Sequence, residues 1–342
     1  MKKSLLALAI LASFAGAASA QSSVTVYGVV DAGVTREIGG AAGSITKLAT
    51  GVQSGNRLGF KGTEDLGGGL KANFQIENGF DLDTGMTRQG GRLFGRQAYD
   101  GLSGGFGAVN LGRQYNPIFL SMDAIDPFGT GLPGATTNLM SAGKVRVDNA
   151  VTYSSPDASG FTFNGLYGAG EVAGSTSSNR TLGASANYAN GPVVATLAYD
   201  KNNANPAVIG STGQKNILLG GTFNFGPVIA HAAYETEKGD SGSKADFRDY
   251  LAGVTVPVGA GSFMASYIKK TDRATNSSLG GKQIAVGYTH SLSKRTNLYT
   301  TYSHISNDAQ GTNYVSDASS GGSVPVAGHS SAAFTVGIRH KF

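Results

Sequence analysis

The stretch LGASANYANGPVVATLAY at residues 182–199 points to the type of fold. In its two halves, 182–188 and 193–199, larger apolar or aromatic side chains alternate with small or polar ones, and an Asn-Gly-Pro sequence at 190–192 separates them. Alternation with a period of two is typical of a β-strand with one apolar and one polar face. Asn, Gly and Pro favour tight turns. The stretch therefore predicts an antiparallel hairpin.

The same pattern recurs along the rest of the chain. Seven short connections rich in Gly, Pro, Asp, Asn or Ser alternate with eight longer polar stretches, which implies about sixteen antiparallel strands. The short connections lie near 66–69, 104–107, 156–160, 190–192, 226–227, 259–261 and 293–295. The longer ones lie near 36–55, 81–91, 115–144, 171–180, 201–214, 238–246, 272–281 and 307–329.

A transmembrane barrel explains this arrangement better than a soluble sandwich, which has no need of hairpins that are tight at one end and long at the other. Outer-membrane barrels have an even number of antiparallel strands, short turns on one side, long loops on the other, and lipid-facing side chains that alternate with lumen-facing ones. Residues 21–342 provide roughly 20 residues for each strand and its connection, enough for a tilted crossing of about 9–11 residues. We therefore expect an all-β, 16-stranded antiparallel transmembrane β-barrel.

Residues 1–20 have the three regions of a cleaved secretory signal peptide. Lys2 and Lys3 precede an apolar run at 5–18, and an Ala-Ser-Ala sequence at 18–20 provides a cleavage site. We therefore expect residues 21–342 to form a single exported barrel domain.

Composition excludes several other classes of protein. The 27 Lys and Arg residues against 22 Asp and Glu residues give a net charge of +5, and the positive charges are dispersed, so no nucleic-acid partner is expected. The chain has no Cys, which excludes disulfides and Cys-based metal or nucleophile chemistry. It has 40% hydrophobic residues, too many for a disordered chain, but no run of about 20 apolar residues after the signal peptide for a membrane-spanning helix.

Four segments of the chain together resemble one protein family. They are VTVYG at 24–28, RLGFKGTEDLG at 57–67, LGRQ at 111–114 and the ending GIRHKF at 337–342. This combination is similar to the trimeric general porins of Gram-negative bacteria, and most of all to their beta-proteobacterial branch. His340 departs from the family, many members of which have Tyr or an apolar residue at that position.

The resemblance implies a water-filled 16-stranded barrel in the outer membrane, three per assembly, with the third extracellular loop folded inward. It implies passive diffusion of small hydrophilic solutes and ions, no cofactor, and contact with outer-membrane lipid, lipopolysaccharide and the barrel-assembly machinery. Two alternatives stay open: a substrate-specific porin for phosphate, sugars or carboxylates, and a barrel whose loops serve as adhesin or receptor.

A pore constriction is expected from the same resemblance and from strand alternation. Arg57 and Lys61 alternate with Leu58 and Phe60, so both basic side chains are expected in the lumen. Arg96 and Arg146 match the other basic wall positions of the family, and Asp123 and Asp126 are the candidate acids of the third long loop, 115–144. The basic surplus predicts a weak anion preference, which lumen acids such as Asp100 and Asp148 would reduce. In the simpler alternative, these arginines are only part of the polar, hydrated inner wall that any such barrel has.

Two further expectations concern assembly. Arg113 shares the face of Val109 and Leu111, which points its charge outward, and the resemblance places it in the trimer interface against Asp81 or Asp83 of a neighbour's second long loop. The chain ends on an aromatic residue, Phe342, on the outward face of the last strand. We expect this residue to be an assembly signal.

Patterns that suggest an enzyme are weak in this sequence. Residues 101–105, GLSGG, match the hydrolase pattern G-x-S-x-G, but that motif needs a strand-to-helix turn. The five His residues show no spacing typical of metal ligands, so no metal site is expected. We expect a protein without catalytic activity.

Overall fold

The computed structural model describes residues 23–240, 245–319 and 321–342. The predicted signal peptide, residues 1–20, lies outside the described residues. The strands are β1 (Ser23–Ile38), β2 (Ile45–Thr50), β3 (Arg57–Gly67), β4 (Leu70–Gly79), β5 (Gln97–Gly104), β6 (Gly107–Tyr115), β7 (Arg146–Ser154), β8 (Phe161–Gly168), β9 (Thr181–Asn190), β10 (Val193–Asn202), β11 (Gln214–Asn224), β12 (Ile229–Gly239), β13 (Asp246–Val258), β14 (Gly261–Asp272), β15 (Gly281–Ser291), β16 (Thr296–Asn307) and β17 (Ser331–Lys341). The helices α2 (Pro117–Ile125) and η2 (Thr136–Asn138) lie between β6 and β7.

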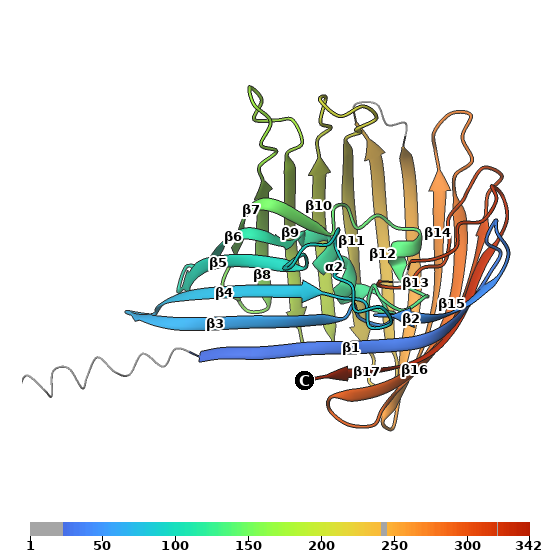
Figure 1. Cartoon of the computed structure of the whole chain (residues 1–342), viewed down its shortest axis with the longest axis horizontal. Coiled ribbons are helices and arrows are strands. Elements are labelled where there is room, and N and C mark those ends of the chain that lie inside the picture. Colours follow the sequence, from blue (N-terminus) through green and yellow to red (C-terminus); the bar gives the residue numbers. More distant parts are fainter. Residues whose placement is uncertain (1–22, 241–244, 320) are drawn as a thin grey trace, which may run out of the picture.

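The strands form one closed antiparallel barrel (Figure 1). Each strand from β3 to β17 pairs with its neighbour in the chain, and β17 pairs with β1 from Val29↔Lys341 to Ile38↔Ala332. This last pairing closes the sheet, so neither end strand keeps an unpaired edge that lipid would have to cover.

Two of the seventeen strands share one position in the barrel. The first half of β1 pairs with β3, from Ser23↔Thr63 to Val29↔Arg57, while its second half pairs with β2, from Ala32↔Thr50 to Glu37↔Ile45. Residues 51–56 interrupt this position. The barrel therefore has the predicted sixteen strand positions.

The seven predicted short connections are all confirmed as the turns between β3 and β4, β5 and β6, and so on to β15 and β16. The long connections lie at the opposite end of the strands. The first is shorter than expected, because β1 continues to Ile38 and residues 45–50 form β2 within the predicted loop. In the part of the chain described, no helix is long and apolar enough to cross a membrane.

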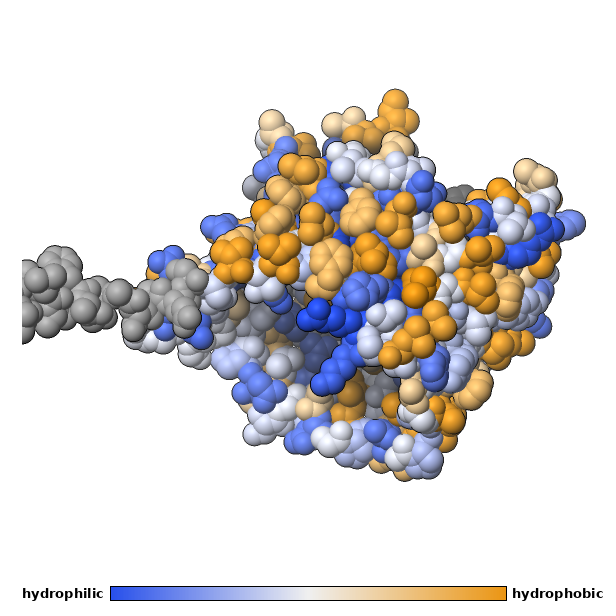
Figure 2. All heavy atoms as spheres, turned by 60° about the horizontal axis from the view of Figure 1, so that its bottom comes forward, coloured by the Kyte–Doolittle hydropathy of each residue, from blue (hydrophilic) through white to orange (hydrophobic). Residues whose placement is uncertain are grey.

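The two faces of each strand have opposite character. In β17, Phe334, Val336 and Ile338 are 47%, 45% and 46% exposed on the outside, whereas Thr335 between them is completely buried inside. Figure 2 shows hydrophobic side chains over the outer surface and hydrophilic ones around the hollow at the centre of the view. An apolar outside and a polar inside are what a barrel in lipid requires.

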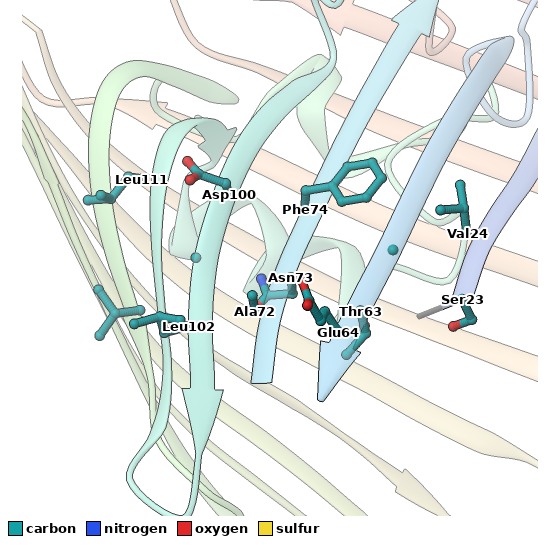
Figure 3. Close-up of a pocket in the computed structure, with 13 residues that line it drawn as sticks. Ser23, Val24, Thr63, Glu64, Ala72, Asn73, Phe74, Asp100, Leu102 and Leu111 are labelled. Atoms are coloured by element: carbon teal, nitrogen blue, oxygen red, sulfur yellow. The ribbon is translucent and has the colours of Figure 1, made fainter. Parts of the chain in front are cut away.

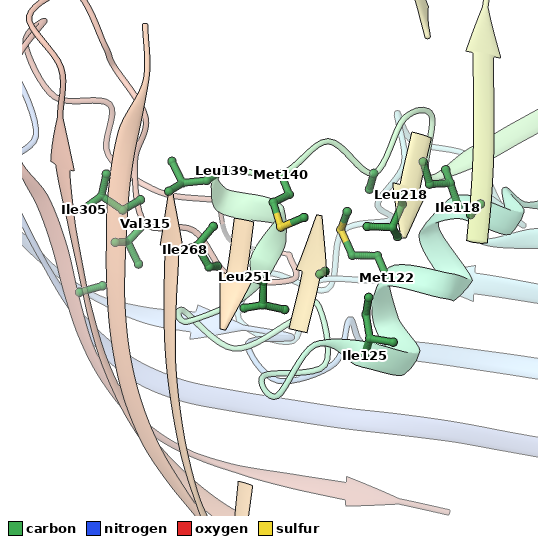
Figure 4. Packing of buried hydrophobic residues seen from close by; sticks show 14 residues of the cluster. Ile118, Met122, Ile125, Leu139, Met140, Leu218, Leu251, Ile268, Ile305 and Val315 are labelled. Atoms are coloured by element: carbon green, nitrogen blue, oxygen red, sulfur yellow. The ribbon is translucent and has the colours of Figure 1, made fainter. Parts of the chain in front are cut away.

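The third loop, defined here as residues 116–145, packs against the inner face of the barrel. Ile118, Met122 and Ile125 form one buried face of α2, and they pack with Leu218 of β11 and Leu251 of β13 (Figure 4). Apolar residues of a short helix can be buried only where a wall covers them. The loop therefore narrows the lumen from within.

Candidate pore site

The basic side chains predicted for the wall lie on one side of the lumen. Arg57 begins β3, Arg96 directly precedes β5, and Arg146 begins β7. The charge of Arg96 acts on both Arg57 and Arg146, and these two arginines also interact with Glu77 and Tyr115. Three strand ends therefore bring together the three arginines that the sequence predicted.

Arg96 is neutralised by an acid that the sequence analysis missed. Its Nε donates to Glu77 Oε1 at 2.6 Å, and its exposed fraction is only 5%. The hydroxyl of Tyr27 donates to the other oxygen, Glu77 Oε2, at 2.9 Å. A paired and buried guanidinium contributes little to the field in the open lumen, because the adjacent carboxylate cancels its charge.

Tyr115 connects two of the arginines. Its hydroxyl oxygen accepts hydrogen bonds from Arg96 Nη2 at 2.7 Å and from Arg146 Nη2 at 2.6 Å. The guanidinium carbon of Arg146 also lies 4.4 Å from the centre of the Tyr115 ring. Phe119 of α2 stacks on Tyr115 with the ring centres 5.3 Å apart. The third loop thus helps to hold Arg146 in place.

Arg57 and Lys61 both extend from the inner face of β3. Arg57 Nε donates to the backbone oxygen of Gly55 at 3.0 Å. Lys61 is exposed, with its Nζ 5.4 Å from the ring centre of Tyr27. Four residues along a strand correspond to about 13 Å, so Lys61 lies further toward the short turns than Arg57.

Arg339 is a fourth arginine on the inner wall, which the sequence analysis did not select. It lies on the inner face of β17, where its Nε donates to Asn297 Oδ1 at 3.0 Å and its Nη1 to Ser54 Oγ at 2.9 Å. Its charge interacts with that of Arg57. Alternation with Ile338 in the final strand was the signal that could have identified it.

Asp123 is the acid of the third loop that faces the basic wall. It lies on the exposed side of α2, where its Oδ1 accepts a hydrogen bond from the Thr130 hydroxyl at 2.5 Å. Desolvation by the enclosing wall raises the pKa of Asp123, while the Thr130 hydrogen bond and the charge of Arg57 oppose this shift. Asp123 therefore stays a candidate acid of the pore constriction.

Asp126, by contrast, does not line the water path. Its carboxylate accepts hydrogen bonds from the backbone N–H groups of Phe128, Thr130 and Thr136 and from the Thr136 hydroxyl, at 2.8–3.0 Å. It is 6% exposed, and burial raises its pKa although these hydrogen bonds act in the opposite direction. Asp126 therefore stabilises the turn after α2, and its expected place in the constriction is corrected.

Arg113 has an acidic partner within its own chain. Its Nη1 lies 2.5 Å from Asp148 Oδ1, and Arg92 Nη1 lies 2.8 Å from the same oxygen. The pairing of β6 with β7 shifts register between Gly112 and Gln114, where Asp148 and Asn149 of β7 lie opposite the single residue Arg113, so β7 carries a bulge beside Arg113. An ion pair in the same chain thus compensates the outward charge without an acid from a neighbour.

The other acids named from the sequence also lie away from the lumen wall. Asp81 pairs with Arg88 within the loop between β4 and β5, at 3.1 Å, and Asp83 is exposed on that loop. Asp100 was expected in the lumen, but it is exposed on the outer face of β5, in register with Phe74 and Leu111. Neither Asp100 nor Asp148, which pairs with Arg113, offsets the basic wall from within the pore.

Phe342 lies over the junction of the first and last strands. Its backbone N–H donates to Gly28 O at 3.1 Å, and its backbone oxygen accepts from Gly28 N at 3.0 Å. The ring covers Gly28 so closely that a Cβ atom there would come within 2.2 Å of it. The final aromatic residue and the glycine are therefore complementary in shape.

The hydrolase-like pattern has no catalytic context. Ser103 lies near the end of β5, and a tight turn leads directly into β6 rather than into a helix. Three histidines have simple partners: His231 Nδ1 contacts Ile125 O at 2.9 Å, His290 Nδ1 contacts the Tyr288 hydroxyl at 3.1 Å, and His340 Nδ1 contacts the Thr296 hydroxyl at 2.8 Å.

A closed barrel with an apolar outside, a charged inner wall and a loop packed inside it defines the class of pore-forming outer-membrane proteins. A family model described as Gram-negative porin matches residues 7–310, and the chain belongs to this family. The protein accordingly resides in the outer membrane.

Individual relatives agree with this assignment. An outer membrane porin protein of Bordetella pertussis is 36% identical over 401 aligned positions, and outer membrane porin protein 32 of Delftia acidovorans is 37% identical over 359, with 100% of both chains covered in each case. The structure of the anion-selective porin from Comamonas acidovorans matches with a TM-score of 0.84 and 32% identity, covering 94% of this chain and 100% of that one.

Proposed function

We propose that the protein is a passive diffusion porin for small hydrophilic solutes and ions, with a weak preference for anions. The observation that carries the proposal is a surplus of unpaired guanidinium groups in the lumen. Among the described residues, no carboxylate forms an ion pair with Arg57, Arg146 or Arg339, whereas Arg96 is paired with Glu77. The proposal includes no catalytic step and no cofactor.

The size of this effect explains why the preference is weak. A unit charge about 8 Å from an ion in water contributes about 0.5 kcal/mol before screening by salt. Asp123 offsets part of the basic surplus. A net excess of one or two positive charges biases permeation several-fold and leaves cations able to pass. Anion selectivity in the Comamonas relative is consistent with this assignment.

The test compares two double variants of the full chain in planar bilayers. Arg57→Gln with Arg146→Gln removes two unpaired charges, and we expect the reversal potential in a tenfold KCl gradient to move toward that of K⁺. Arg96→Gln with Glu77→Gln removes a neutral ion pair and is the matched control, for which we expect the reversal potential of the wild type. An unchanged potential in the first variant would contradict the assignment.

We further propose that three copies assemble through the outer face of β3 to β6. This face carries Asp100 and a hollow of about 530 Å³ between Val24, Phe74 and Leu111 (Figure 3). A carboxylate on the lipid-facing side of a barrel is unfavourable, although less so than Arg or Lys. A second copy that covers this face removes the carboxylate from lipid.

Because the chain has no Cys, single cysteines can map this interface. Leu102→Cys places a thiol beside the hollow, and Leu219→Cys places one on the outer face of β11 as a control. With a short bis-maleimide in native membranes, we expect cross-linked subunits only for Leu102→Cys. Cross-linking at Leu219→Cys alone would place the interface elsewhere.

At this interface, Arg113 does not require Asp81 or Asp83 of a neighbouring copy as its acidic partner. Asp148 supplies the acid for Arg113 in the same chain. Any contact with a neighbour would therefore be additional to an existing ion pair.

Saturable block of the current by phosphate, a sugar or a carboxylate would support the substrate-specific porin as the function instead of a general diffusion pore.

A further inference from the structure

A cluster of three carboxylates lies on the inner wall opposite the arginines, on strands that the pore assignment does not use. Glu235 and Glu237 extend from β12, and Asp249 extends from β13. Glu235 lies directly opposite Asp249 in the pairing of these strands. Like charges in opposite positions repel each other, so this arrangement needs compensation.

The third loop covers the cluster and removes it from water. The backbone N–H of Ser141 donates to Glu235 Oε2 at 2.9 Å, and Lys270 Nζ donates to the backbone oxygen of Leu139 at 2.8 Å. Glu235 and Asp249 are 0% exposed, and Glu237 is 4% exposed. Buried ionised carboxylates are very costly, so such groups are paired, bound to a cation or neutralised by protons.

Lys270 compensates only one of the three negative charges. Its Nζ lies 2.5 Å from Glu237 Oε1 and 3.8 Å from Asp249 Oδ2. With all three carboxylates ionised, two negative charges would be left without compensation, and three oxygen atoms have no hydrogen-bond donor among the described residues: Glu235 Oε1, Asp249 Oδ1 and Asp249 Oδ2. The cluster therefore offers both charge and free oxygen atoms to a ligand.

The geometry points to a calcium site formed by Glu235, Glu237 and Asp249. One carboxylate oxygen of each residue lies within 4.8 Å of those of the other two. Calcium binds oxygen at about 2.3–2.6 Å, so two ligands on opposite sides of the ion are about 5 Å apart. The remaining two negative charges equal the charge of one divalent cation.

Calcium suits this cluster better than magnesium. Calcium accepts irregular geometry and several carboxylate oxygens, whereas magnesium requires near-ideal octahedral geometry and retains most of its water. Little water reaches the wall beneath residues 139–141. The bound ion connects β12 and β13 and, through the hydrogen bond between Glu235 and Ser141, secures the end of the third loop to the wall.

The test measures calcium binding to the full chain refolded in detergent from inclusion bodies, because lipopolysaccharide binds divalent cations itself. Equilibrium dialysis with radioactive calcium at neutral pH should give one saturable site per chain. The variant Glu235→Gln with Asp249→Asn should bind at least about tenfold more weakly. The control Glu64→Gln with Asp100→Asn removes two exposed outer carboxylates and should bind like the wild type.

Two further measurements keep the proposal falsifiable if the double variant does not fold. Calcium should raise the unfolding temperature of the wild type and have a smaller effect on Glu235→Gln alone, because a ligand that binds the folded state stabilises it. The proposal is overturned if the wild type shows no saturable calcium binding. It is also overturned if infrared spectra at neutral pH show a protonated carboxyl band that these variants lose, because protons then neutralise the cluster.

Discussion

At the scale of single residues, the immediate partner determines whether a charged side chain acts on the pore. Arg57 and Arg96 lie on the same wall, and the sequence predicted both. The pairing of strands places Glu77 beside Arg96, whereas no carboxylate in the described part of the chain forms an ion pair with Arg57. Alternation along a strand predicts which face a side chain takes, but it does not predict the neighbour across strands or across a bulge, as Arg113 and Asp148 illustrate.

Asp123 should make the selectivity of the pore depend on pH. Because desolvation raises its pKa, Asp123 becomes neutral at a higher pH than an ordinary aspartate. Lowering the pH from about 7 toward about 4 should therefore remove negative charge beside Arg57 and increase the anion preference. Reversal potentials measured over this range should show the step in the wild type.

The matched variant is Asp123→Asn, which keeps the size of the side chain. It should be more anion-selective than the wild type at neutral pH and should lack the step assigned to residue 123. A step of the same size in both proteins would mean that another group titrates in the pore.

Gly28 is predicted to be essential for the position of Phe342. The substitution Gly28→Val adds a side chain where the ring already lies, and overpacking of this kind costs about 1–3 kcal/mol. The temperature at which the folded protein unfolds on a denaturing gel should fall. Gly165→Val in β8 is the control, because an added Cβ there meets no atom within 4 Å.

Deletion of Phe342 tests the same contact from the other strand. It should reduce the yield of folded protein in the outer membrane, because the final strand loses its backbone pairing with Gly28 and its covering ring. A normal yield from the shortened chain would show that Phe342 is not an assembly signal.

At the scale of elements, the strands were predictable and the loop was not. Seven turns and sixteen strand positions follow from alternation and turn residues, because these are local features of the sequence. Helix α2 was missed because it is short and its burial depends on a wall that other strands provide. The break between β2 and β3 was missed for a similar reason: β1 pairs with each of them along a different half.

Asp126 is predicted to maintain the conformation of the third loop. Asp126→Ala removes the acceptor of four hydrogen bonds and leaves buried N–H groups without partners, each costing about 1–3 kcal/mol. Single-channel recordings should show increased current noise and closure at lower voltage. Asp123→Ala in helix α2, three residues earlier, should change the selectivity and leave the noise at the wild-type level; equal noise in both variants would contradict the structural role.

At the scale of the whole molecule, a closed barrel presents its apolar outer face to lipid and its polar inner face to water. Pairing of β1 with β17 leaves no sheet edge in lipid, and the third loop narrows a lumen that would otherwise be wide. The fold and the family could be predicted from the sequence because period-two alternation, turn spacing and a few motifs extend over its whole length. The cluster of Glu235, Glu237 and Asp249 could not, because its members meet only through strand pairing and the cover of the third loop.

The most direct test of the central claim is the single-channel conductance of the purified wild-type protein in planar bilayers over a range of KCl concentrations. A water-filled diffusion pore should give a conductance that increases in proportion to salt without saturating. In a salt gradient, the same channels should give a reversal potential shifted from zero toward the equilibrium potential of chloride. The account would be contradicted by a conductance that saturates, by a reversal potential shifted toward the equilibrium potential of potassium, or by the absence of channels.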